Sequence, residues 1–219
     1  MKVNIFDIDD TIVKKTTAQY FIVYALKEKV IRFSQINKLL IDWIKYKIAR
    51  PDNDFIEHTV KKLKGIKKSD LDRVAEITFQ KKIKQNIYAD AASLIWEAQK
   101  RGERVIFATS SMEFIIKPIE KFFKTEPSLA TTMEYKDGLT TGKLEGYSLF
   151  GKKKKDSVSE WMTKNNIRIE DTSFYSDSYT DIPLLEYCAN PNAVNPDRIL
   201  KKKAKKLGWK ILRFKKTLG

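Results

Sequence analysis

The chain has 219 residues, 42% of them hydrophobic, and its 43 lysines and arginines against 28 acidic residues give a formal net charge of +15. This composition excludes a disordered chain, and the length suits one large domain or a core with an insertion. The single cysteine, Cys188, excludes an internal disulfide and fits a cytoplasmic protein, and we expect no membrane span because no apolar stretch reaches about 18 residues.

The positive charge leaves two interpretations open. Either the protein binds a polyanion such as nucleic acid or an anionic surface, or its lysines are solvated and help to attract a small anionic substrate. The lysines are spread along the chain, with local runs at residues 152–155 and 201–206 and no RNA-binding or zinc-finger signature beside them. We therefore favour the solvated surface, do not expect a nucleic acid partner, and keep a basic binding protein as the alternative.

The first element is predicted to be a buried strand over residues 3–6, and Asp7, Asp9 and Asp10 follow it directly. Carboxylates at the end of a buried strand must be exposed, paired or bound to a cation, because burying them without a partner is prohibitive. A short apolar run that meets acids also differs from a signal peptide. We therefore expect a positive group close to these acids.

Four helices are predicted next, because apolar residues recur at three-and-four spacing over residues 16–29, 34–48, 52–63 and 68–85. Ser34, Asp52 and Ser69 are plausible N-caps for the last three helices. Consecutive helices without an intervening strand form a helical unit, roughly residues 13–84. The aromatic residues of this unit lie at helical spacing, and we interpret them as its core rather than as a surface that contacts substrate.

Helices and strands alternate in the rest of the chain. Strands are predicted over residues 104–110, 172–176, 192–195 and 209–214, and helices over residues 90–102, 112–123, 157–166, 180–189 and 197–208. The Asp137-Gly138 pair and its threonine-rich flanks predict a β-hairpin within residues 131–151. This alternation is typical of a parallel sheet with right-handed crossovers, so the predicted fold class is α/β with a helical insertion after the first strand.

Acids and hydroxyls follow three of the predicted strands at the points where the strands end. The segments are Asp7 to Thr11, Thr109 to Ser111, and Ser176 to Asp181. Taken alone, the second and third segments more often indicate helix caps, and the first is as typical of a polar turn as of a functional site. Ligands of open α/β sheets, however, bind at the carboxyl ends of the strands, and all three segments lie there. Asp7, Asp9 and Asp177 would supply oxygen ligands for a hard cation such as Mg²⁺. Zinc is not expected, because His58 and Cys188 lie far apart in the sequence.

These segments resemble the motifs of the haloacid dehalogenase (HAD) superfamily. DIDDT, which begins at Asp7, is similar to the DxDxT motif, Thr109 with Ser110 resembles the second motif, and SDSYTD resembles the fourth, a DxxxD sequence. The third motif is a lysine at the start of a helix. In GKKKKDSVSEWM, Lys154 fits this motif best, because apolar residues follow it at four and seven positions and would form the buried face of the helix. Lys155 is the second choice.

The resemblance implies a phosphoserine-phosphatase-like member of HAD subfamily IB, with a Rossmann-like parallel-sheet core, an inserted all-helical C1 cap and a small β-hairpin. The core would comprise residues 1–12 and 85–219, and the cap would comprise residues 13–84. The implied activity is that of a Mg²⁺-dependent phosphomonoester hydrolase, which acts through an aspartyl-phosphate intermediate on a small phosphorylated metabolite.

The resemblance also implies a role for each motif residue, while Asp10 has none. The catalytic residues would be the nucleophile Asp7, the general acid and base Asp9, and the charge-offsetting Lys154. The phosphate-binding residues would be Thr109, Ser110 through its amide, and Thr11. The groups that hold Mg²⁺ would be the Asp7 carboxylate, the Asp9 backbone carbonyl and Asp177, supported through water or the lysine by Asp181.

Substrate choice is less determined by these motifs. Phosphoserine phosphatases carry a glutamate after the first motif and a cap arginine, whereas residues 13–17 contain no acid and HTVKKLKG contains no arginine. We therefore do not expect phosphoserine, and phosphoserine phosphatase remains an alternative. Lys14 and Lys15 either contact a second anionic group of a sugar, nucleotide or other phosphate, or point into water.

Overall fold

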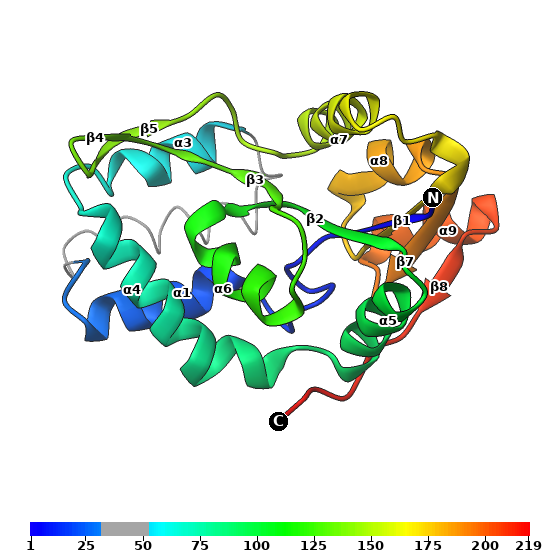
Figure 1. Ribbon diagram of the computed structural model, residues 1–219, viewed down its shortest axis with the longest axis horizontal. Coiled ribbons are helices and arrows are strands. Elements are labelled where there is room, and N and C mark those ends of the chain that lie inside the picture. The colour runs from blue at the N-terminus through cyan, green and yellow to red at the C-terminus, as the bar shows by residue number, and fades with distance from the viewer. Residues whose placement is uncertain (32–52) are drawn as a thin grey trace.

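A parallel sheet forms the centre of the molecule, in the order β3-β2-β1-β6-β7-β8 (Figure 1). The computed structural model describes residues 1–31 and 53–219. The strands of this sheet are β1 (Val3–Phe6), β2 (Arg104–Met112), β3 (Leu129–Thr131), β6 (Thr172–Ser176), β7 (Asn190–Val194) and β8 (Lys210–Leu212). The sheet and its flanking helices confirm the predicted α/β class.

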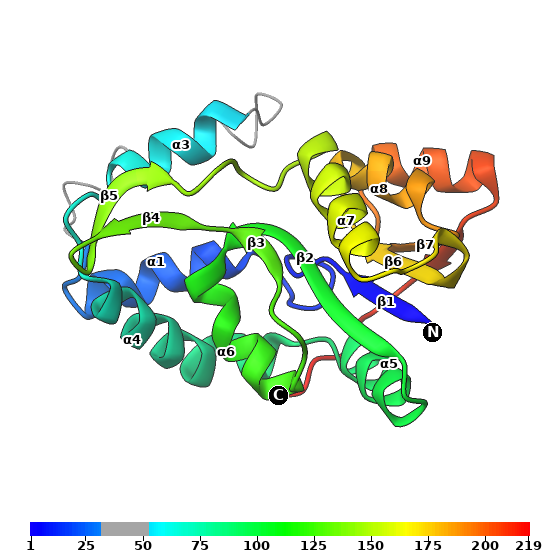
Figure 2. The ribbon, with the colours of Figure 1, turned by 45° about the horizontal axis from the view of Figure 1, so that its top comes forward.

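Helices cover both faces of the sheet (Figure 2). The core helices are α5 (Ala89–Lys100), α6 (Glu113–Phe123), α7 (Lys152–Lys164), α8 (Ile182–Tyr187) and α9 (Arg198–Leu207), with short 3-10 turns at Ile169–Asp171 and Tyr179–Asp181. Successive residues of a strand point to opposite faces, so Val3 and Ile5 pack in the cluster that α7, α8 and α9 complete, whereas Phe6 packs with α5 and α6. No helix in the described part of the chain is long and apolar enough to cross a membrane.

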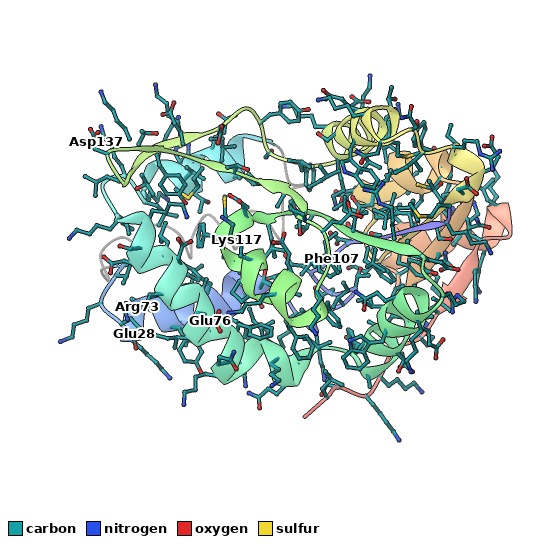
Figure 3. All side chains as sticks on the ribbon, in the orientation of Figure 1. Glu28, Arg73, Glu76, Phe107, Lys117 and Asp137 are labelled. Atoms are coloured by element: carbon teal, nitrogen blue, oxygen red, sulfur yellow. The ribbon has the colours of Figure 1, made fainter. Side chains whose placement is uncertain are left out.

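The described helices between β1 and α5 form a helical unit at one end of the sheet (Figure 1). Its described elements are α1 (Thr17–Lys27), α3 (Asn53–Lys61) and α4 (Lys68–Thr78), with a π-helical turn at Phe79–Ile83 and a 3-10 turn at Lys84–Asn86. Arg73 of α4 binds Glu28, with Nη1 2.6 Å from Oε2, and so joins the end of α1 to α4 (Figure 3). The helix predicted over residues 34–48 and the N-caps Ser34 and Asp52 lie outside the described residues.

The predicted β-hairpin is present as β4 (Met133–Lys136) and β5 (Leu139–Leu144), which are antiparallel. Its turn residues Asp137 and Gly138 have φ angles of 51° and 75°, the left-handed values that a tight hairpin turn needs. The hairpin lies against α3, with Asp137 at its outer tip (Figure 3). The division into a core of residues 1–12 with 85–219 and a cap of residues 13–84 stays a prediction.

The structure corrects several predicted boundaries. Ser69 is not a helix cap, because α4 begins at Lys68 and the Lys68 amide donates to the Gly138 carbonyl at 2.8 Å. The hairpin thus provides a carbonyl acceptor for an amide in the first turn of the helix, a role that a capping side chain often has. α7 begins at Lys152 rather than at residue 157, and the edge strand β3 is not among the predicted strands.

Candidate active site

The loop after β1 places Asp7 and Asp9 at the carboxyl edge of the sheet. The carbonyl of Ile8 accepts the amides four and five residues further on, each at 2.9 Å, so the chain turns sharply there. Asp10 has a φ of 53°, and its Oδ1 accepts the Lys15 amide at 2.9 Å. Asp10 therefore stabilises the turn, while Asp7 and Asp9 bind side chains from other elements.

Lys154 lies between two carboxylates in the first turn of α7. Its side chain is buried, and its Nζ lies 3.0 Å from Oδ1 of Asp7 and 2.8 Å from the Asp181 carboxylate. Burial lowers the pKa of Lys154, but the charges of Asp181 and Asp7 raise it by more, so the ammonium group stays charged. Lys155 faces away, with its Nζ 3.4 Å from Oδ1 of Asp156. Lys154 is thus the lysine that the fold brings to the first acid.

Asp9 is held by donors from two distant parts of the chain. Its Oδ1 accepts the amide of Thr17, the first residue of α1, at 2.6 Å, and its Oδ2 accepts the Ser111 hydroxyl of β2 at 2.6 Å. The two hydroxyl oxygens of Thr17 and Ser111 lie 3.1 Å apart. Burial raises the pKa of Asp9, and the hydrogen bonds from Ser111 and Thr17 oppose that shift only in part. Asp9 therefore holds a proton more readily than an exposed aspartate does.

The negative charge of Asp7 and Asp177 is only partly offset by Lys154. Burial raises the pKa of Asp7 to about 7, against the opposing effect of Lys154. Burial also raises the pKa of Asp177 well above its ordinary value, and nearby carboxylates, Asp7 first among them, add to the shift. Thr11 donates to Oδ1 of Asp177 at 3.3 Å and so joins the loop after β1 to the loop after β6. One ammonium group thus serves several carboxylates.

The donor set fits a hard cation. Asp7 and Asp177 offer carboxylate oxygens, and their raised pKa values mark a place where added positive charge would be stabilising. Within residues 1–31 and 53–219, no group of three or more His, Cys, Asp or Glu side chains forms a complete metal cluster. Mg²⁺ does not need such a cluster, because it binds through one or two carboxylates and retains water or a phosphate as further ligands.

The second predicted segment lies at the carboxyl end of β2. Thr109 is buried, and its hydroxyl accepts the Ser111 amide at 3.2 Å. The Ser110 carbonyl accepts the Thr131 hydroxyl of β3 at 2.8 Å, which fixes this end of the strand to its neighbour. The backbone here is therefore held in place beside the Ser111 hydroxyl that binds Asp9.

Several sequence predictions can be compared with this geometry. Asp7, Lys154 and Asp181 lie in contact, and Thr11 contacts Asp177. Ser111 and Thr17 have no predicted role, although the sequence held weak signals for both, since Ser111 ends a predicted hydroxyl segment and Thr17 lies in the first turn of a predicted helix. Lys14 and Lys15 are exposed.

A family model described as haloacid dehalogenase-like hydrolase matches residues 5–186 of the chain. The chain belongs to the haloacid dehalogenase-like hydrolases. The histidinol-phosphatase of Neisseria meningitidis serogroup C is 30% identical to it over 220 residues, covering 96% of this chain and 98% of the relative. The HAD resemblance is confirmed, and the chain is a HAD-family phosphatase.

Solved structures share this HAD fold. A protein of unknown function from Bordetella pertussis Tohama I superposes with a TM-score of 0.86 at 23% identity, covering 96% of this chain and 97% of the other. A phosphoserine phosphatase, solved as an analogue of the phospho-aspartyl intermediate, superposes with a TM-score of 0.70 at 20% identity, covering 99% of this chain and 95% of the other. At these identities the likeness shows the fold alone.

Proposed function

We propose that this HAD phosphatase is a Mg²⁺-dependent phosphomonoester hydrolase that forms an aspartyl phosphate on Asp7. The observation that carries the proposal is the pairing of two unlike acids at the end of β1. Oδ1 of Asp7 lies 3.0 Å from the Lys154 ammonium group, whereas Asp9 accepts hydrogen bonds from two neutral groups, the Thr17 amide and the Ser111 hydroxyl. Two carboxyl groups in such different surroundings suit a nucleophile and a general acid.

In the first step, a carboxylate oxygen of Asp7 attacks phosphorus and the bond from phosphorus to the ester oxygen breaks. Asp9 donates its proton to that oxygen, so the leaving group departs as an alcohol. In the second step, Asp9 takes a proton from a water molecule, whose oxygen attacks phosphorus and releases phosphate from Asp7. The carboxylate nucleophile thus divides one difficult displacement into two easier ones.

Charge and position supply the rest of the proposed catalysis. Lys154 offsets negative charge beside Asp7, and Thr109 with the Ser110 amide binds phosphoryl oxygens while Thr11 fixes the loop. Bound Mg²⁺ would supply further charge neutralisation. The groups that would hold it are the Asp7 carboxylate, the Asp9 backbone carbonyl and Asp177, with Asp181 supporting through Lys154 or water.

The proposed substrate is a small phosphorylated metabolite other than phosphoserine. The relative at 30% identity is named a histidinol-phosphatase, which supports a small phosphate ester as substrate. The lack of an acid at residues 13–17 and of an arginine in HTVKKLKG argues against phosphoserine. Lys14 and Lys15 are exposed, so the geometry does not favour the sugar, nucleotide or other polyanionic phosphates that these lysines suggested.

The test is the Mg²⁺-dependent release of phosphate from p-nitrophenyl phosphate by the wild-type protein and by Asp7→Asn. We expect the variant to lose activity by about 10³-fold or more, because the amide is a poor nucleophile. Chelation of Mg²⁺ should abolish the wild-type activity, and readdition should restore it. Asp10→Asn is the matched control, since Asn can still accept the Lys15 amide, and it should stay close to wild type. Full activity of Asp7→Asn would disprove the assignment.

A further inference from the structure

A cavity of about 170 Å³ lies beside Asp9, between the helical unit and the core. Its wall includes the proposed general acid Asp9 together with Ser110 and Ser111 of β2. Most of the remaining wall is apolar and comes from α1, α3, α6 and the residues after α1 and α3. Its main apolar side chains are Phe21, Ile22, Ile31, Ile56, Leu63 and Phe114.

Buried, closely packed side chains from both the helical unit and the core form the cavity wall. Phe21 of α1 and Phe114 of α6 are each 3% exposed, and their rings meet edge to face with centroids 5.1 Å apart. Ile31 and Leu63 are also buried. Residues from the helical unit and from the core thus form one continuous apolar surface. Phe21 is one of the aromatic residues predicted to form the core of the helical unit, and it also lines this cavity.

The charges of the wall restrict what can bind in it. Among the described residues, Asp9 is the only ionisable side chain that lines the cavity, and no lysine or arginine does. Against these described wall residues, a carboxylate or a second phosphate would lose its hydration while gaining no positively charged partner, which is unfavourable. An apolar group would gain from leaving water, by an amount that grows with each buried methylene.

The position of the cavity relates it to the leaving group. Asp9 is proposed to protonate the ester oxygen, so the carbon chain beyond that oxygen must start next to Asp9. Asp9 lines the same cavity as the apolar side chains. A dry, apolar cavity of about 150 Å³ is large enough to bind benzene, so this one can hold an aromatic ring or a chain of about six carbons.

We infer that this protein prefers phosphate monoesters whose leaving group is apolar, of about the size of an aryl ring or a six-carbon chain. The inference rests on the proposed function, because it assigns the cavity to the group that Asp9 protonates. It replaces the expectation of a second anionic group on the substrate with that of an uncharged, hydrophobic one.

The experiment compares kcat/KM for methyl, butyl and hexyl phosphate with that for phosphoserine and glycerol 3-phosphate. We expect kcat/KM to rise by up to about fourfold for each added methylene up to about six carbons, in line with the transfer of methylene groups out of water. Both polar esters should be hydrolysed at least tenfold less efficiently than hexyl phosphate.

Variants of half-buried wall residues test the cavity itself. Ile22→Asn should lower the ratio of kcat/KM for hexyl to methyl phosphate by about tenfold, because it places an amide against the chain. Ile56→Asn, on helix α3, should lower this ratio in the same way, and it replaces the first variant if Ile22→Asn folds poorly. Val23→Asn is the matched control, since Val23 is the next residue of α1 but is 48% exposed, and it should leave the ratio unchanged.

The possible outcomes separate the two proposals. If kcat/KM does not depend on chain length, or if phosphoserine is preferred, the inference is wrong while the phosphatase assignment stands. An unchanged ratio in both Ile22→Asn and Ile56→Asn would also overturn it. If no ester, p-nitrophenyl phosphate included, releases phosphate with Mg²⁺ present, the proposed function itself fails.

Discussion

At the scale of single residues, the site depends on how each acid is surrounded. Asp7 and Asp9 are two positions apart in one loop, yet a buried ammonium group contacts the first and neutral donors contact the second. The loop also carries Asp10, whose carboxylate is used by the turn itself. Three neighbouring aspartates thus have different chemistry because different elements reach them.

Ser111 gives a test of this view through the pH dependence of activity. Its hydrogen bond lowers the pKa of Asp9, so Ser111→Ala should raise that pKa further. Since Asp9 is proposed to act as a general acid, the fall of kcat/KM on the alkaline side should move to higher pH. The pH profile with p-nitrophenyl phosphate checks this. Ser111→Thr keeps the hydroxyl and should restore the wild-type profile, whereas a shift to lower pH in Ser111→Ala would contradict the role of Asp9.

At the same scale, the sequence predicts some residues of the candidate site and not others. The positions of Asp7 and Asp181 follow from motif spacing, because parallel strands must bring their carboxyl ends to one edge. Lys154 follows instead from the apolar residues four and seven positions after it. The partners of Asp9 do not follow in this way. Ser111 and Thr17 reach it only because the loop after Ile8 turns sharply, and that turn depends on backbone hydrogen bonds that leave no clear pattern in the sequence.

At the scale of elements, α9 supports the site from the side of the sheet. Its N-cap residue Asp197 accepts the amides of Ile199 and Leu200, each at 2.8 Å. The other carboxylate oxygen accepts the Tyr179 amide at 2.6 Å, and the Asp197 amide donates to the carbonyl of Asp177 at 2.9 Å. One residue therefore caps a helix and fixes the loop between the two acids of the fourth motif.

Asp197→Ala should consequently reduce both stability and activity. The loss of the cap costs about 1 kcal/mol, and the Tyr179 amide left without its acceptor adds about 1 kcal/mol or more. Urea unfolding measures the stability. Phosphate release at varied Mg²⁺ concentration measures the effect on Asp177, because a misplaced Asp177 should raise the Mg²⁺ concentration needed for half-maximal activity. Asp197→Asn keeps an acceptor oxygen and should lose less of both. Unchanged Mg²⁺ dependence in Asp197→Ala would contradict a role for α9 in positioning Asp177.

Elements with strong periodicity are predictable, and short or tertiary-dependent ones are not. The long apolar pattern of α6 and the Asp137-Gly138 turn both identify their elements correctly. β3 consists of the three residues Leu129–Thr131, too few to show alternation, and it exists because it pairs with β2. The start of α4 is likewise set by the hairpin rather than by Ser69.

At the scale of the whole molecule, the buried acids connect stability to pH. Burial raises the pKa values of Asp7, Asp9 and Asp177 above those of an unfolded chain, that of Asp7 to about 7. Between about pH 4 and pH 7, the folded protein therefore binds more protons than the unfolded chain, and its free energy of unfolding falls as the pH rises. A bound cation should offset this loss.

Thermal unfolding of the metal-free protein should show this trend. We expect the melting temperature to be lower at pH 8 than at pH 5.5 by about 5 °C, and Mg²⁺ to raise it more at pH 8. Asp7→Asn removes one of the titrating groups and should flatten the pH dependence. A melting temperature that rises across this pH range, or a larger effect of Mg²⁺ at pH 5.5, would contradict the charge balance described for the site.

The position of β1 in the sheet has a consequence for how the molecule assembles. Val3 is aligned with Arg104 on one side and with Thr172 on the other, so β1 is synthesised before both of the strands with which it pairs. Its four buried residues stay exposed on the nascent chain while the helical unit can already fold from local contacts. Closing such long loops slows folding, so the strand that precedes the proposed nucleophile Asp7 completes its pairing only after most of the chain has emerged.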